Sequence, residues 1–246
     1  MVAKAAPDGY TLLMAANGPI AVAPGLTKKM PYDSIADFSP VGLVTIYASV
    51  VVVHPAVPAK TMKELITYAK ANPGKLNFAT PGAGSTNHLA VELLKAMAGI
   101  DLVHVPYKGT GIAIGDLIGG QVDLMSGDLP ALLPHVRTGK LRALGVTSAK
   151  RTPLLPEVPT VSEGGVPGFE SVGWFAVMAP AGVPKPIITR LNGDLQKIIA
   201  SEEMREKLSS LGAEPAGSTP EQLGAHVREQ VVKWAKVVRA AGLKPE

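Results

Sequence analysis

The part of the chain best suited to chemistry is a glycine-rich turn at residues 81–86, with the sequence PGAGST. Its two glycines can adopt positive φ angles, which lets main-chain N–H groups point into a cavity. Ser85 directly precedes an apolar helical pattern, so we expect it to be the N-cap of a helix. A helix N-terminus after such a turn offers unpaired N–H donors, partial positive charge and a hydroxyl, which suit an anion. The residues expected to bind a carboxylate are therefore Gly82, Ala83, Gly84, Ser85 and Thr86.

The same residues also fit other kinds of turn. An ordinary strand–helix turn with a serine cap shows the same pattern and binds nothing. A phosphate-binding loop requires a lysine after its last glycine, and this turn has none. A G-x-G-x-x-G pattern would have Asn87 at its last position. Nucleotide binding is therefore excluded here.

Three further polar residues are candidates for the same site. His88 follows in the first helical turn, where it can bind a ligand or simply cap the helix or face solvent. Tyr107 follows the next strand and offers an apolar wall with one hydroxyl. Asn17 follows the strand expected at residues 10–14 and can reach the site from another part of the fold.

Asp128 has two interpretations. It follows a strand expected at residues 122–125, so its carboxylate can face the same site. There it would repel a carboxylate ligand unless that ligand also carries an ammonium group. Alternatively, Asp128 is the N-cap of a helix that starts near Pro130.

Composition excludes several classes of protein. The 246 residues carry a net charge of +4, but only 18% are charged and 4% aromatic, without the basic stripe or stacking platforms typical of nucleic-acid binding. No apolar run reaches the roughly 18 residues of a membrane span. The absence of cysteine removes disulfides, thiolate metal sites and cysteine nucleophiles. The N-terminus lacks the apolar segment of a signal peptide.

The motifs also argue against an enzyme. The five histidines show no H-E-x-x-H spacing, so we expect no metal. No G-x-S-x-G elbow is present, and Ser85 has no evident base, so we expect no catalytic residue and no cofactor.

Strand and helix patterns alternate through the middle of the chain. Strands are expected at residues 76–80, 102–105, 122–125 and 141–146, with helices between them. This β-α-β-α order predicts a parallel α/β sheet, and the β-branched run Ala48–Val53 fits a strand buried on both faces. In such a sheet the loops that begin at Thr80, Pro106 and Ser126 face one cavity.

The remaining elements frame this region. We expect two strands in Val41–Val53 and another at Ser171–Ala179. Thr61 with Glu64, and Thr219 with Gln222, have the spacing of capping boxes. The chain is expected to end with two helices, the first over Ile187–Leu211.

Six segments in order resemble one family: PDGYTLL at 7–13, MPYDSIADFSPVGLV at 30–44, KANPGKLNFATPGAGSTNHLA at 70–90, VPYKGTG at 105–111, GKLRALGVTSAKR at 139–151 and MAPAGVP at 178–184. Together they are similar to the Bug/TctC family, the solute-binding receptors of tripartite tricarboxylate transport systems. The resemblance implies an α/β periplasmic binding protein fold (type II-like) with two lobes, a two-strand hinge and a ligand closed between them. It implies one lobe of residues 1–52 with 174–246, and another of residues 53–173.

The resemblance also implies a function. It indicates a periplasmic receptor, expected to be a monomer, that captures a small organic acid or amino-acid-like ligand and delivers it to membrane transporter subunits. The alternatives are an α/β enzyme acting on a small acid and a ligand sensor outside transport. Family members have a secretion signal, a strand, a glycine-rich loop and a helix before PDGYTLL, and this chain lacks them. We therefore expect this chain to lack the second glycine-rich loop that would bind the carboxylate from the other side.

Overall fold

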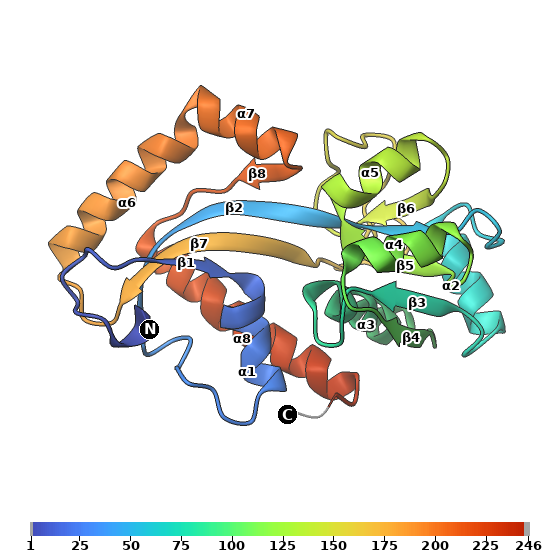
Figure 1. Cartoon of the computed structure of the whole chain (residues 1–246), viewed down its shortest axis with the longest axis horizontal. Coiled ribbons are helices and arrows are strands. Elements are labelled where there is room, and N and C mark those ends of the chain that lie inside the picture. The colour runs from blue at the N-terminus through green and yellow to red at the C-terminus, as the bar shows by residue number, and fades with distance from the viewer. Residues whose placement is uncertain (1, 244–246) are drawn as a thin grey trace. The chain divides into compact units, whose positions relative to one another are not determined.

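The computed structural model describes residues 2–243, and the chain packs as two compact units. The first unit holds the chain up to Tyr47 and again from Gly173, and the second unit holds Ala48–Val172. Two strands, labelled in Figure 1, meet this boundary: β2 (Phe38–Val53) continues through it, and β7 (Val172–Pro180) begins at it. The long strand β2 therefore contributes backbone to both units.

The first unit combines short strands with long helices. Strand β1 pairs antiparallel with β7, and β8 pairs antiparallel with Thr45–Tyr47 of β2. Helix α8 packs against η2 and α1, and its Trp234 is fully buried, as is Trp174 of β7. Besides β2 and β7, the elements of this unit are η1 (Val2–Lys4), β1 (Leu13–Ala16), η2 (Gly18–Val22), α1 (Ala23–Leu26), α6 (Lys185–Ala200), α7 (Glu202–Ser210), β8 (Ala213–Pro215) and α8 (Pro220–Ala240).

The second unit is a layered α/β sheet. Strand β3 is parallel to β4 and β5, whereas β2 is antiparallel to β5 on one side and to β6 on the other. Its elements after β2 are α2 (Met62–Ala71), β3 (Asn77–Thr80), α3 (Thr86–Ala98), β4 (Val103–Pro106), α4 (Thr110–Ile118), β5 (Leu124–Asp128), α5 (Leu129–Arg137) and β6 (Arg142–Val146).

Helices cover both faces of this sheet. Val51 and Val53 of β2 join one apolar core with residues of α2 and α3. Val50 and Val52 point the other way and join a second core with residues of α4 and α5. Burial on both faces explains why residues 50–53 are all apolar. The predicted α/β architecture is therefore confirmed.

Two details of the predicted sheet are wrong. The apolar run is antiparallel to both of its neighbours, because the sheet is mixed and burial on both faces does not require parallel partners. Residues 41–53 also form one strand with the residues before them, not two strands. Gly42 lies within this strand, where a Cβ atom would come within 2.9 Å of Nδ2 of Asn192 on α6, so this glycine permits close helix packing.

The helix predicted over Ile187–Leu211 is also wrong, because it is divided at Ser201. The Ser201 hydroxyl donates to the carbonyl of Ile198 at 2.7 Å and accepts from the N–H of Met204 at 3.3 Å, so it ends α6 and caps α7. Ile198 and Leu211 consequently lie outside the core, with 52% and 64% of their surfaces exposed. The short strand β8 after this break was not predicted.

The predicted helix caps are largely confirmed. Thr219 and Gln222 form both hydrogen bonds of a capping box at the start of α8. Thr61 caps α2 by accepting from the N–H of Glu64 at 3.1 Å. The Glu64 carboxylate, however, accepts from the N–H of Lys60, one residue before the cap.

Candidate functional site

The glycine-rich turn lies between β3 and α3, as predicted. Gly84 has a φ angle of +73°, in the left-handed region that glycine tolerates. Ser85 is the N-cap of α3, and its hydroxyl accepts from the N–H of His88 at 3.2 Å. The turn therefore presents the start of a 13-residue helix, with the partial positive charge that this carries.

Two of the predicted donors of this turn are used by the protein itself. The Ser85 hydroxyl donates to the carbonyl oxygen of Gly82 at 2.8 Å. The N–H of Gly84 donates to Nδ1 of His88 at 3.0 Å. His88 is 1% exposed, so its ring does not face solvent. The ring contacts the turn from the interior side, through the N–H of Gly84. The Ser85 hydroxyl and the Gly84 N–H thus bond within the protein and stabilise the turn.

Other donors of the same turn remain free. Within the described residues, the N–H groups of Gly82, Ala83, Thr86 and Asn87 have no acceptor, nor has the hydroxyl of Thr86. Thr86 and Asn87 are the first two residues of α3, where N–H groups have no partner inside the helix. These groups can hold the oxygens of an anion by charge-assisted hydrogen bonds.

The loop after β4 lies beside this turn. The N–H of Tyr107 donates to the carbonyl of Thr80 at 2.9 Å, and the Tyr107 carbonyl lies 3.8 Å from where a Cβ of Gly82 would be. The Tyr107 hydroxyl donates to Asp116 at 2.8 Å. Burial and this carboxylate raise the pKa of Tyr107. Tyr107 can therefore offer its ring to a ligand, while its hydroxyl is held by Asp116.

Asp128 lies at the end of β5, close to the start of α3. It occupies the N-cap position of α5, but its side chain makes no capping hydrogen bond. Its Oδ1 atom lies 3.5 Å from Nδ2 of Asn87, and the carboxylate is exposed. The structure thus brings Asp128 to the turn, together with Tyr107. This agrees with the prediction that the loops after these strands converge.

Sequence reasoning missed a polar group behind these residues. Asn87 is buried, and its Oδ1 accepts from the Ser49 hydroxyl at 3.0 Å. The backbone N–H and carbonyl of Ser49 both bond to the Thr147 hydroxyl, at 2.8 and 3.0 Å. Ser126 is fully buried, and its hydroxyl has no partner among the described residues. The sequence signal that could have revealed this group is a single polar residue within each apolar segment, namely Ser49, Asn87 and Ser126.

Asn17 belongs to the first unit. It begins the helical segment η2 and does not lie in a loop, and it is 1% exposed. Neither its amide nitrogen nor its oxygen has a hydrogen-bond partner in the described chain. Because an unpaired buried amide is costly, Asn17 is a candidate to bond a water molecule or ligand.

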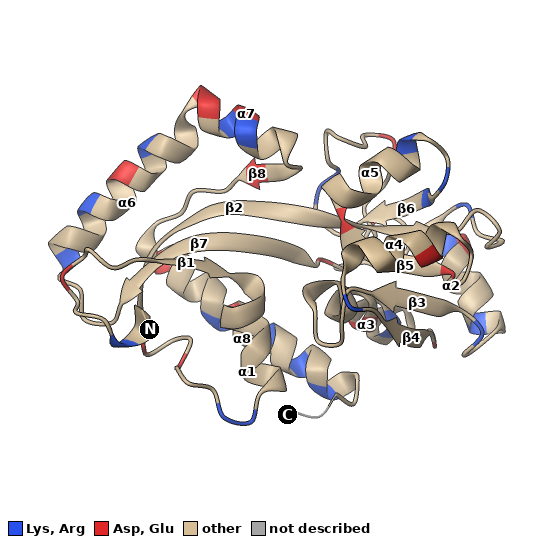
Figure 2. Cartoon of the chain, in the orientation of Figure 1, with Lys and Arg blue, Asp and Glu red and all other residues tan. Residues whose placement is uncertain are grey.

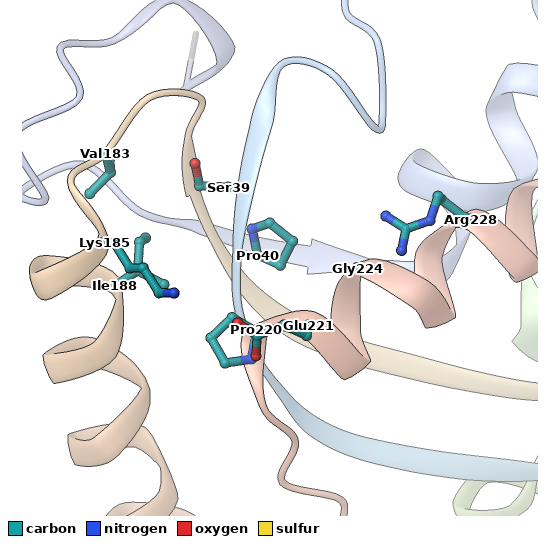
Figure 3. Close-up of a pocket in the computed structure, with 9 residues that line it drawn as sticks. All are labelled: Ser39, Pro40, Val183, Lys185, Ile188, Pro220, Glu221, Gly224 and Arg228. Atoms are coloured by element: carbon teal, nitrogen blue, oxygen red, sulfur yellow. The ribbon is translucent and has the colours of Figure 1, made fainter.

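A cavity of about 490 Å³ lies elsewhere in the first unit. It opens between the start of α6 and the start of α8, with Lys185 and Arg228 at its sides (Figure 3). None of the predicted site residues lines it. Its open, mostly apolar walls offer fewer convergent polar groups than the turn, so we place the candidate site at the turn.

The charged residues of α6 and α7 pair with one another on the surface. Lys and Arg alternate with Asp and Glu along α6 and α7 (Figure 2), where they form exposed pairs such as Lys207 with Glu203. In the described part of the chain, no group of three or more His, Asp or Glu side chains is placed to hold a metal ion. Nor is any described helix long and apolar enough to cross a membrane.

Comparison with known proteins decides the family. Residues 1–243 match the model of the tripartite tricarboxylate transporter family receptor. The chain belongs to this receptor family. The relative BugT of Bordetella pertussis is 39% identical over 243 residues, which are 98% of this chain and 74% of BugT. The Bug/TctC resemblance of the sequence is thereby confirmed.

Solved structures of the receptor family share the fold. Rpa4515 of R. palustris, solved with adipate, is 38% identical with a TM-score of 0.84, over 100% of this chain and 82% of that one. MatC of Rhodopseudomonas palustris, solved with bound malate, is 34% identical with a TM-score of 0.76, over 96% and 82%. The periplasmic binding protein fold is therefore confirmed.

Proposed function

We propose that this receptor-family chain binds a small carboxylate at the turn between β3 and α3. The observation that carries this proposal is the set of unused donors at that turn, above all the N–H groups of Ala83 and Thr86 and the Thr86 hydroxyl. A carboxylate matches these donors in charge and in having two oxygens. No metal or cofactor is needed for such binding.

Dicarboxylates are the ligands to test first. Two relatives of known structure were solved with adipate and with malate, both dicarboxylates. Asp128 favours a different class, because its exposed carboxylate beside Asn87 would attract an ammonium group. An amino-acid-like ligand is therefore the second candidate, and Tyr107 and Asn17 remain proposed contacts for either class.

We further propose a periplasmic receptor that acts as a monomer and delivers its ligand to the membrane subunits of a transporter. The family assignment and the periplasmic relatives support this role. In this proposal the two units are the lobes of the receptor, and β2 and β7, which meet their boundary, are the hinge. Binding without chemical turnover is the expected behaviour.

Calorimetric titration tests the proposal. Malate, adipate and aspartate are titrated into the protein, with hexanediol as the uncharged counterpart of adipate. We expect saturable binding of at least one acid, no binding of the diol, and recovery of the acid unchanged. Binding of the diol as tightly as adipate, or conversion of the acid to a product, would contradict the proposed receptor function.

A further inference from the structure

Behind the candidate turn lies a group of three stacked rings. The rings of His88 and His104 stack with centroids 3.8 Å apart and planes 12° apart, and Phe78 stacks on His104 at 4.9 Å. Phe78 and His104 are opposite each other in the parallel pairing of β3 with β4. Phe78 is fully buried, His88 is 1% exposed and His104 is half-buried, so the stack lies mostly in the interior.

Each imidazole is connected to the turn by hydrogen bonds. Nδ1 of His88 accepts from the N–H of Gly84 at 3.0 Å, which places the proton of a neutral His88 on Nε2. Nε2 of His104 lies 2.7 Å from the Thr80 hydroxyl, which itself donates to the Gly82 carbonyl at 3.1 Å. His104 therefore donates to the Thr80 hydroxyl, which donates in turn to the Gly82 carbonyl.

These hydrogen bonds orient the peptide group between Gly82 and Ala83. The Gly82 carbonyl oxygen accepts from Thr80 and also from the N–H and the hydroxyl of Ser85, at 3.3 and 2.8 Å, so it points into the protein. In a trans peptide the N–H points opposite to the carbonyl. The N–H of Ala83 therefore points outward, where it has no acceptor among the described residues.

We propose that His88 and His104 are positioning residues, a stacked imidazole pair that fixes the turn so that the Ala83 N–H faces the ligand. The inference rests on the proposed function, in which this turn binds a carboxylate. Neither histidine touches the ligand: His88 orients the Gly84 peptide, and His104 orients the Gly82–Ala83 peptide through Thr80. A preformed turn pays no ordering cost when the anion arrives.

The stack also has charged neighbours that complete its surroundings. Glu92 of α3 lies 3.7 Å from Nε2 of His88 and 2.9 Å from the ammonium of Lys95. Burial alone would raise the pKa of the Glu92 carboxyl, but its contacts with His88 and Lys95 lower it below its ordinary value. Lys95 in turn lies 5.6 Å from the centre of the Phe78 ring. These groups hold the His88 ring with Nδ1 toward the turn.

Four substitutions separate hydrogen bonding from packing. His88→Asn keeps an acceptor near the position of Nδ1, and His88→Phe keeps a ring in the stack but has no acceptor. His104→Gln keeps a donor toward Thr80, and His104→Phe keeps only the ring. Each variant is first compared with the wild type in thermal unfolding, so that loss of folding is recognised.

The first measurement needs no ligand. We expect hydrogen exchange of the Gly84 N–H to accelerate about tenfold in His88→Phe, because one hydrogen bond is lost, and to change less in His88→Asn. The ¹⁵N shifts of the wild-type imidazoles should show protonated Nε2 and unprotonated Nδ1 on His88. Equal protection of Gly84 in both variants, or a proton on Nδ1 of His88, would overturn the positioning role.

The second measurement is calorimetric affinity for malate and adipate. We expect each Phe variant to lose about tenfold in affinity and each polar variant to retain most of it. Equal losses in the Phe and polar variants would also overturn the inference. A wild type that binds neither acid would instead contradict the proposed function, while the exchange measurement would still decide whether the imidazoles fix the turn.

Discussion

The hydroxyl of Ser85 donates to the carbonyl oxygen of Gly82 at 2.8 Å. The same hydroxyl accepts from the N–H of His88, so both of its hydrogen-bonding roles serve the turn and the first turn of α3. A ligand can use only the remaining lone pair, which does not attract an anion. Ser85 therefore stabilises the turn, and its hydroxyl proton is already used within it.

Ser85→Ala should accordingly act on stability. We expect the free energy of unfolding to fall by about 1 kcal/mol, the usual cost of losing an N-cap side chain. Affinity for a carboxylate should change less than it does when Thr86 is altered. Thermal unfolding and calorimetry on the same preparation measure both effects. A variant that melts like the wild type but binds much more weakly would show that Ser85 contacts the ligand.

Thr86→Val should act on affinity. Valine keeps the shape of the side chain and removes the hydroxyl, which has no partner in the described chain. We expect binding to weaken by about 1.5 kcal/mol, or roughly tenfold in Kd, as for a charge-assisted hydrogen bond. Thr67→Val is the matched control, because Thr67 is exposed on α2 and bonds only the carbonyl of Lys63. Equal affinities of the two variants would remove Thr86 from the site.

Gly84→Ala should destabilise the turn, because Gly84 has φ +73° and a Cβ is unfavourable there. We expect a cost of about 1–2 kcal/mol in stability, with loss of affinity as the turn changes shape. Gly111→Ala serves as control, since Gly111 lies in α4 with open space around its Cα. The control should be neutral or stabilising. A Gly84→Ala protein with normal melting temperature and affinity would contradict the positioned turn.

The candidate site could be predicted from sequence only where it depends on contacts between residues that are neighbours in the chain. The Ser85 cap, the turn and the helix after it follow from neighbouring residues, because caps and glycine turns depend on short-range sterics. The stacking of His104 on His88 depends on the register of β3 with β4, which pairs His104 with Phe78, and on the packing of α3, which carries His88, against β3. No periodicity in one sequence encodes that register, so the pair was not predicted.

The same distinction explains the errors in the fold. The stretch Ala48–Val53 was correctly expected to be buried, because its composition of mostly β-branched apolar residues predicts burial. Its antiparallel neighbours, β5 and β6, come from later parts of the second unit, and the run itself does not show their direction. Ser201 divides a helical pattern because its hydroxyl donates to the carbonyl of Ile198 at the end of α6 and accepts from the N–H of Met204 at the start of α7, and the helical pattern alone does not show these bonds.

His104 predicts a pH dependence of stability. Burial and then the neighbouring His88 lower the pKa of His104 to about 4, from 6.5 in an ordinary histidine. The unfolded chain therefore binds a proton at this residue at higher pH than the folded protein does. The stabilising contribution is complete above pH 6.5 and is lost as the pH falls from about 6.5 towards 4.

Melting temperatures across that range check this prediction. The groups that face His104 are His88, Glu92 and Lys95 of α3, with Phe78 and Thr80 of β3. His104→Gln keeps the bond toward Thr80 but cannot titrate, so its melting temperature should fall less steeply with acid than that of the wild type. Parallel curves for the two proteins would show that His104 is not held neutral by the fold.

Asp128 predicts which class of acid the site prefers. Malate and aspartate differ at one position, where malate has a hydroxyl and aspartate an ammonium group. If the Asp128 carboxylate faces the ligand, Asp128→Asn should strengthen malate binding and weaken aspartate binding, each by about 1 kcal/mol for a charge partly screened by water. Added salt should reduce both changes.

Asp101→Asn is the matched control for this charge. Asp101 precedes β4, whereas Asp128 ends β5, so the two carboxylates belong to opposite ends of the parallel strands. Calorimetry of both acids with both variants separates a local effect from a change in net charge. If Asp128→Asn shifts the affinities for malate and aspartate in the same direction, or no more than Asp101→Asn does, Asp128 lies outside the site. The ligand would then be chosen by the donors of the turn alone, which favour carboxylates without regard to an ammonium group.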